Sequence, residues 1–94
     1  MASILIVEDD DQFRAMLGEL LTGAGHEVWG TPNGTKVGPL HQQHRFDLII
    51  TDLVMPDKEG LEVIMELRRK DQNVKIIAMS GQRQNRAATY LRMA

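Results

Sequence analysis

Three short runs of consecutive apolar residues place the strongest constraint on the fold. They read I-L-I-V, L-I-I and I-I-A-M, and they lie in predicted strands at Ser3–Val7, Asp47–Thr51 and Val74–Met79. A strand exposed on one face would alternate apolar and polar residues, so uninterrupted runs indicate strands buried on both faces, as in a parallel sheet. A fourth, shorter strand is predicted at Glu27–Gly30. All these runs are far shorter than a membrane span.

Between the strands, apolar residues recur at helical spacing. Gly23 and Gly25 are predicted to end the first helix, and Asp10 or Asp11 can cap its start. Its apolar stripe is predicted to comprise Phe13, Met16, Leu17, Leu20 and Leu21.

Two later helices are predicted with less regular patterns. Proline is tolerated at the first position of a helix, so a short helix is expected to start near Pro39 after irregular residues. The next helix presents Leu61, Ile64, Met65 and Leu67 and closes with the basic residues 68–70. A last helix is predicted over Arg83–Ala94.

Strands that alternate with helices in this way predict an α/β fold with a doubly wound parallel sheet. The 94 residues allow a single domain, 1–94.

Composition excludes several classes of protein. The chain has no cysteine, which excludes disulfide scaffolds, zinc–thiolate sites and thiol nucleophiles. Its net charge is −2 and only 4% of its residues are aromatic, so direct nucleic-acid binding is not expected. Acidic residues within the first dozen positions argue against a signal peptide, and we therefore expect a cytoplasmic protein without membrane contact.

The candidate chemistry lies where the predicted strands end. Glu8, Asp9 and Asp10 follow the first strand, Asp52 follows the third, and Ser80 follows the fourth. Ligands of open parallel sheets bind beside the carboxyl ends of the strands, so these side chains are expected to converge. Crowded carboxylates repel unless one is protonated or a cation lies among them, and all-oxygen ligands suit Mg²⁺.

A carboxylate beside Mg²⁺ can attack phosphorus and form an aspartyl phosphate. In such a site the Ser80 hydroxyl would steady the phosphoryl oxygens, and Gly81 would leave room for them and lend a backbone N–H.

Three motifs carry a resemblance to a known family. They are I-L-I-V-E-D-D, D-L-I-I-T-D-L-V-M-P-D-K-E-G and K-I-I-A-M-S-G, in this order along the chain. Together they resemble the receiver domain of two-component response regulators, which has a flavodoxin-like fold. The D-x-x-M-P-x-x-x-G element that begins at Asp52 is the most specific of them.

The resemblance implies a role for each residue of the motifs. Asp52 would accept the phosphoryl group, and Glu8 and Asp9 would hold Mg²⁺ together with Asp52 and the main-chain carbonyl of Val54. Ser80, with Gly81, would be the switch that draws its loop toward the phosphoryl group. The partner would be a histidine kinase or a phosphotransfer protein, and the domain would act as a signalling module rather than a turnover enzyme.

The chain departs from the family pattern at its end. It stops at Ala94, before the fifth strand, the fifth helix and the lysine that receivers carry, so the expected strand order is 2-1-3-4 and the domain is expected to be incomplete. A continuation beyond Ala94 is the favoured expectation for the native protein. Self-association into a homodimer through the exposed sheet edge is the other.

Alternative functions remain open from the residues. A receiver that has lost phosphorylation would act only as an interaction or dimerisation module. A phosphatase using Asp9 and Asp11 as a D-x-D pair is disfavoured, because Gln12 and Phe13 follow in place of a small Gly-Thr continuation. His41 and His44 could share a metal at helical spacing, but no third ligand is apparent.

Overall fold

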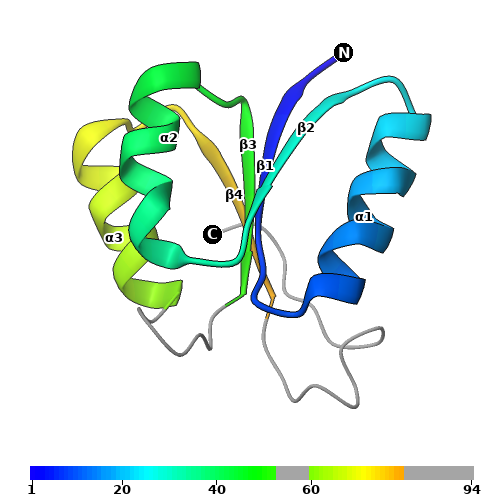
Figure 1. Cartoon of the computed structure of the whole chain (residues 1–94). Helices are drawn as coiled ribbons and strands as arrows, with labels where there is room; N and C mark the ends of the chain where they lie inside the picture. Colours follow the sequence, from blue (N-terminus) through cyan, green and yellow to red (C-terminus); the bar gives the residue numbers. More distant parts are fainter. Residues whose placement is uncertain (53–59, 80–94) are drawn as a thin grey trace.

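The computed structural model describes residues 1–52 and 60–79, which form a sheet with helices on both of its faces (Figure 1). Helix α1 covers one face, and helices α2 and α3 lie together on the other. The elements in chain order are β1 (Ser3–Val7), α1 (Asp11–Gly23), β2 (Glu27–Thr31), the 3-10 turn η1 (Gly34–Lys36), α2 (Val37–His44), β3 (Leu48–Asp52), α3 (Gly60–Lys70) and β4 (Lys75–Met79).

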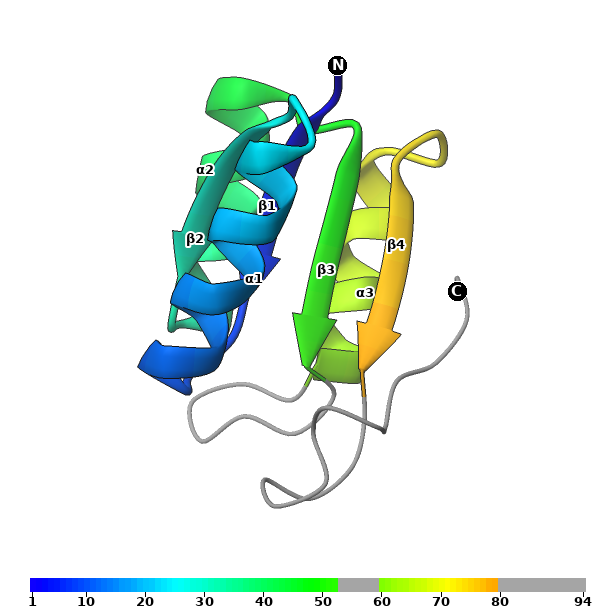
Figure 2. The same ribbon diagram turned by 90° about the vertical axis from the view of Figure 1, so that its right-hand side faces the viewer.

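The four described strands are all parallel and lie in the order β2-β1-β3-β4. Figure 2 shows them side by side with their carboxyl ends at one edge. Strand β1 is central: Val7 is in register with Thr31 of β2 and with Thr51 of β3. The predicted doubly wound α/β fold and the order 2-1-3-4 are confirmed.

Both faces of the central strands are buried, which explains the unbroken apolar runs. Along β1, Leu5 and Val7 belong to the core beneath α2 and α3, while Ile4 and Ile6 belong to the core beneath α1. The exposed fraction of these four side chains is at most 2%. A period of two therefore sends alternate apolar residues into two separate cores.

Helix α1 begins and ends as its sequence predicts, but the apolar stripe that packs against the sheet is narrower than predicted. The Asp10 carboxylate caps the helix by accepting the N–H groups of Gln12 and Phe13, both at 3.1 Å. At the other end Gly25 adopts a φ of 97°, a left-handed conformation that glycine enters without a steric penalty.

Two residues of the predicted stripe do not pack against the sheet. Phe13, Leu17 and Leu21 contact the core, whereas Met16 is 47% exposed and Leu20 is 63% exposed. One helix over a twisted sheet touches it along a single i, i+4, i+8 line, so residues on either side of that line stay in water.

Helix α2 begins at Val37, two residues before the predicted start at Pro39. The prediction of irregular residues before Pro39 was wrong, because Gly34–Lys36 form a 3-10 turn whose first N–H groups are capped by the Asn33 carboxamide, which accepts the Thr35 N–H at 2.8 Å. Pro39 is the third residue of α2, where the backbone N–H makes no bond within the helix, so its missing donor costs nothing.

Helix α3 buries a different set of residues from the one predicted. Val63, Ile64 and Leu67 are buried, whereas Met65 is 60% exposed. The helix turns by about 100° per residue, and placing Val63 toward the sheet carries Met65 to the solvent side. The predicted helix over Arg83–Ala94 lies outside the described residues.

A hydrogen-bonded histidine ties three segments together at the amino end of the sheet. The imidazole of His41, in α2, lies 2.9 Å from the Asp71 carboxylate through Nε2 and accepts the Phe46 N–H at 3.0 Å through Nδ1. Because the amide can only donate, Nδ1 is the acceptor and Nε2 carries the proton toward Asp71. Asp71 follows α3, and Phe46 precedes β3.

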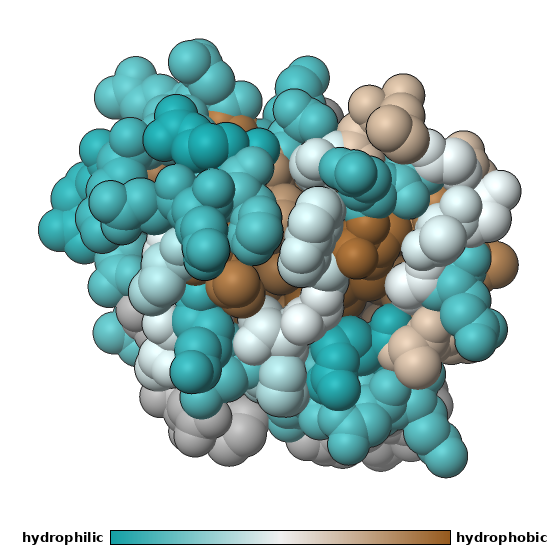
Figure 3. Space-filling view, turned by 45° about the horizontal axis from the view of Figure 1, so that its top comes forward, coloured by the Kyte–Doolittle hydropathy of each residue, from teal (hydrophilic) through white to brown (hydrophobic). Residues whose placement is uncertain are grey.

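The outer surface differs between the two sides of the sheet. Figure 3 shows a mostly hydrophilic surface over α2 and α3, and apolar side chains visible in a recess between α1 and the sheet. No helix in residues 1–52 and 60–79 has the length and the apolar character that a membrane crossing requires.

The narrow stripe of α1 predicts unequal costs for two neighbouring truncations. Leu17→Ala removes atoms packed against the core and should lower the free energy of unfolding by about 1–2 kcal/mol. Leu20→Ala removes mostly solvated atoms and should change it by less than about 0.5 kcal/mol. Urea unfolding of both variants would measure the difference, and equal costs would contradict the packing of α1.

The His41–Asp71 pair predicts a loss of stability in acid. Hydrogen bonds from His41 and from the Asn73 N–H hold the pKa of Asp71 below its ordinary value. A carboxyl whose pKa is lower in the folded state stabilises the fold above the unfolded-state pKa of about 3.9. That contribution is lost as the pH falls below about 4. In urea unfolding at stepped pH, Asp71→Asn should flatten the decline in this range, and Glu19→Gln, on the exposed side of α1, should leave it unchanged.

Candidate metal centre

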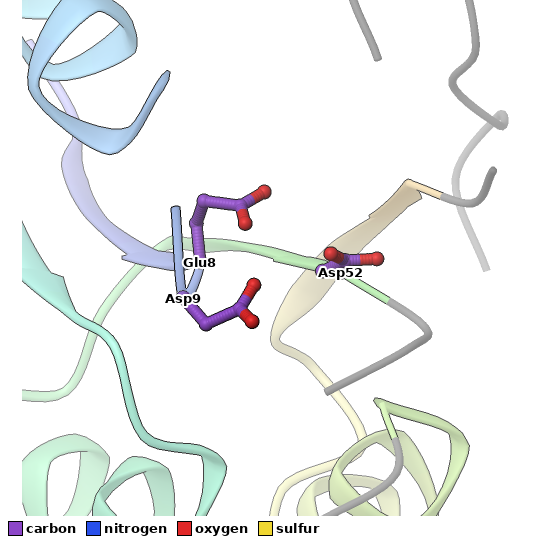
Figure 4. Close-up of side chains that lie close together, drawn as sticks. All are labelled: Glu8, Asp9 and Asp52. Carbon is purple, nitrogen blue, oxygen red and sulfur yellow. The ribbon is translucent and has the colours of Figure 1, made fainter. Parts of the chain in front are cut away.

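Three carboxylates from two neighbouring strands meet at the carboxyl edge of the sheet (Figure 4). Glu8 and Asp9 directly follow β1, and Asp52 is the last residue of β3, the strand beside it. One oxygen from each carboxylate lies within 4.8 Å of the others. The predicted convergence of Glu8, Asp9 and Asp52 is therefore present in the structure.

Burial and hydrogen bonds fix two of these side chains. Glu8 is fully buried and Asp52 is 2% exposed, whereas Asp9 is half-buried. An oxygen of Glu8 accepts the backbone N–H of Asp10 at 2.9 Å, which holds the carboxylate inside its own turn. The site thus combines two buried carboxylates, Glu8 and Asp52, with one more accessible carboxylate, Asp9.

The other two residues of the acidic run, Asp10 and Asp11, have structural roles outside the three-carboxylate group. Asp10 is the helix cap described above, as one of the two predicted alternatives. Asp11 pairs with Arg14 at 2.7 Å on the outer side of the first helical turn, and it is not in the three-carboxylate group. The D-x-D pair that a phosphatase would need from Asp9 and Asp11 is therefore not formed.

Three predicted site residues lie outside the described part of the chain. They are Val54, Ser80 and Gly81, and their predicted roles stay predictions.

His41 and His44 do not form the metal site that their spacing would allow. Both ring nitrogens of His41 are engaged, by Asp71 and by the Phe46 N–H. The ring of His44 packs against that of Trp29, with the centroids 5.0 Å apart and the ring planes tilted by 32°. Within residues 1–52 and 60–79, the only cluster of three or more potential metal ligands consists of Glu8, Asp9 and Asp52.

The donor set suits a hard divalent cation. Three carboxylates this close repel one another, and a cation among them removes that repulsion. Oxygen donors without nitrogen or sulfur fit Mg²⁺, which binds through few carboxylates and keeps several waters. The residues present therefore fit the magnesium ion that the sequence predicts.

Comparison with known proteins identifies the family. The model of the response regulator receiver domain matches residues 4–93. The chain belongs to the response regulator receiver domain family. Receiver domains are the signalling modules of two-component systems, so the resemblance read from the three sequence motifs is confirmed.

Individual relatives and a solved structure agree with this assignment. The receiver is 40% identical over 81 residues to the DNA-binding transcriptional regulator NtrC of Azospirillum brasilense, covering 86% of this chain and 17% of that protein. It is 35% identical over 79 residues to the chemotaxis protein CheY of Thermotoga maritima, covering 83% of this chain and 66% of CheY.

The response regulator TrrA of Thermotoga maritima, solved with Mg²⁺ and BeF, superposes with a TM-score of 0.82 at 34% identity, covering 94% of this chain and 76% of TrrA. The receiver thus spans a small part of NtrC and about two thirds or more of CheY and TrrA.

Sequence reasoning missed two residues that shape the turn after β1. Thr31, at the end of β2, is 5% exposed and its carbonyl accepts the Glu8 N–H at 3.0 Å. The Arg14 guanidinium donates to the Glu8 carbonyl at 2.7 Å. The position of Thr31, at the end of a strand and at the same edge as the acids, is a signal that the sequence offered. Arg14 lies within a helix, and no sequence pattern pointed to its contact with Glu8.

The crowded carboxylates predict that neutralising one of them stabilises the metal-free protein. Asp52→Asn keeps the shape of the side chain and removes one of three like charges, so the free energy of unfolding should rise by roughly 1 kcal/mol. Urea unfolding in the presence of a chelator would measure this. Glu19→Gln removes a distant surface charge and should have no comparable effect, and a loss of stability in Asp52→Asn would argue against repulsion at the site.

Proposed function

We propose that this receiver accepts a phosphoryl group on Asp52 in a Mg²⁺-dependent reaction and thereby switches its binding to a partner. The observation that carries the proposal is the meeting of the Glu8, Asp9 and Asp52 carboxylates within 4.8 Å. A lone aspartate at the end of a strand would offer a nucleophile but nowhere to neutralise the charge of the phosphoryl group.

Burial suits Asp52 to the role of nucleophile. Its side chain is 2% exposed at the end of a strand paired on both sides, with Thr51 in register with Val7 and Asp52 itself in register with Met79. The backbone that carries the carboxylate is thereby fixed, and phosphoryl transfer depends mainly on positioning and charge neutralisation.

The transfer itself needs little from the protein beyond this. A carboxylate oxygen of Asp52 forms the new bond to phosphorus while the bond from phosphorus to the donor breaks. The donor leaves with the electron pair of that bond, and the ionised carboxylate has no proton to lose. When bound, Mg²⁺ would neutralise charge on the phosphoryl oxygens, and Glu8 and Asp9 would hold it together with Asp52.

The remaining roles rest on the family resemblance. The Val54 carbonyl would complete the protein ligands to the metal, and the Ser80 hydroxyl and the Gly81 N–H would contact the phosphoryl group. Movement of Ser80 toward that group would shift a conformational equilibrium and change the partner-binding surface.

The proposed partner is a histidine kinase or a phosphotransfer protein in the cytoplasm. Among the relatives, one is the sporulation initiation phosphotransferase F of Bacillus subtilis, 29% identical over 78 residues. A receiver that is not phosphorylated and acts only by binding or dimerising is the alternative outcome of the experiments below.

The metal arm of the proposal is tested by thermal unfolding. Millimolar Mg²⁺ should raise the Tm, since a ligand that binds only the folded state stabilises it. Asp9→Asn should lose most of the shift, while Glu19→Gln should keep it. An unchanged Tm in the wild-type protein would remove the metal site from the proposal.

The phosphorylation arm is tested with a small phosphodonor. Acetyl phosphate and Mg²⁺ should add one phosphoryl group, detected by intact-protein mass spectrometry, with acetate as the leaving group. Asp52→Asn should abolish the addition and Asp47→Asn, at the opposite edge of the sheet, should retain it. A wild-type protein that binds Mg²⁺ and stays unmodified would favour the interaction module.

A further inference from the structure

Arg14 makes two short contacts on either side of the turn that carries Asp9. One guanidinium nitrogen donates to the main-chain carbonyl of Glu8 at 2.7 Å, and the other donates to the Asp11 carboxylate at 2.7 Å. The Arg14 side chain is 22% exposed and that of Asp11 is 82% exposed. The guanidinium therefore joins the end of β1 to the first turn of α1, across the loop that carries Asp9.

Arg14 donates to the Glu8 carbonyl, which is the group at which the β1–β2 hydrogen-bond ladder ends. The Glu8 N–H still bonds to the Thr31 carbonyl and continues the β1–β2 ladder one step beyond Val7. In a parallel ladder, the Glu8 carbonyl would next accept the N–H of Asn33. That N–H bonds instead to the Thr31 hydroxyl at 3.2 Å, and Arg14 replaces it at Glu8.

A glycine in the edge strand gives Arg14 its path. A Cβ placed on Gly30 would lie 3.2 Å from Cδ and 3.3 Å from Cγ of Arg14, which is tighter than an ordinary van der Waals contact. Any side chain at position 30 would therefore press on the arginine stem. The open backbone of β2 lets the stem lie along the sheet and deliver the guanidinium to Glu8.

We propose that Arg14 is a positioning residue for the divalent cation: by fixing the main chain of Glu8, it fixes the directions of the Glu8 and Asp9 carboxylates. The inference rests on the proposed function, because it concerns how tightly the same site holds its metal. A residue that holds a ligand in place contributes to metal affinity without touching the metal.

Positioning and simple electrostatics predict opposite results. A positive guanidinium near the site repels a cation, so removing the charge alone would tighten metal binding. The carboxylate of Asp11, paired with the guanidinium at 2.7 Å, opposes that repulsion. The loss of restraint on Glu8 should therefore outweigh the loss of positive charge, and metal binding should weaken.

The test measures the Kd for Mg²⁺ by calorimetric titration. Arg14→Met keeps most of the stem and removes every donor, and it should weaken Mg²⁺ binding roughly tenfold. Arg14→Lys keeps the charge with a different reach and should fall between this variant and the wild-type protein. The matched control is Arg69→Met, which removes an exposed arginine from α3 and should leave the Kd unchanged.

A second variant perturbs the contact and keeps the arginine. Gly30→Ala crowds the Arg14 stem and should weaken Mg²⁺ binding several-fold. Gly38→Ala, where an added Cβ meets no atom within 4 Å, should not. This pair decides the question if Arg14→Met fails to fold.

The outcomes separate this inference from the proposed function. If the wild-type protein binds no Mg²⁺, the proposed metal site fails. If the wild-type protein binds Mg²⁺ and Asp9→Asn does not, the site stands; unchanged or tighter binding in Arg14→Met and Gly30→Ala would then overturn the positioning role alone.

Discussion

Parallel pairing of β1 with strands on both of its sides is the constraint on which the rest of this receiver depends. It buries Leu5 and Val7 in one core and Ile4 and Ile6 in the other, and it sets the ends of β1 and β3 at the same edge. Once those ends are level, the acids at the end of β1 and of β3 lie side by side. The crowding of carboxylates is thus a result of sheet register rather than of any contact between the acids themselves.

That crowding is unfavourable for folding and useful for chemistry. Glu8 and Asp52 are almost fully buried charges next to each other, and the hydrophobic cores on either side of the sheet offset the cost. Sites that hold like charges together are commonly less stable than their surroundings and gain stability from a ligand of opposite charge. The Arg14 contact belongs to the same balance, since it restrains the loop without entering the site.

The strands and the acid cluster could be read from the sequence because both follow from local pattern. Unbroken apolar runs identified β1, β3 and β4, and the acidic residues at the ends of the first two of these strands identified Glu8, Asp9 and Asp52. Helix faces were read less well: Met16, Leu20 and Met65 have the spacing of core residues, yet the crossing of each helix over the sheet leaves them in water. The spacing of apolar residues predicts which face of a helix is apolar, but the packing of the helix on the sheet decides how much of that face is buried.

The start of α2 and the role of His41 show a second limit. The helix was predicted to start near Pro39, whereas α2 begins at Val37, directly after the 3-10 turn that Asn33 caps. His41 gains its partners from Asp71, 30 residues away, and from a backbone amide, and no local pattern encodes such a pairing. Long-range polar contacts of this kind emerge only when the chain has folded.

The His41 contacts lie at one end of the sheet, and the acidic site lies at the other. They join α2, the entry to β3 and the turn after α3 at the end of the sheet farthest from the acids. Substitutions there would lower the stability of the whole fold, whereas substitutions among the acids would change which ligands the site binds. A protein engineer could therefore alter the specificity of the acidic site and leave unchanged the His41 contacts that stabilise the opposite end of the sheet.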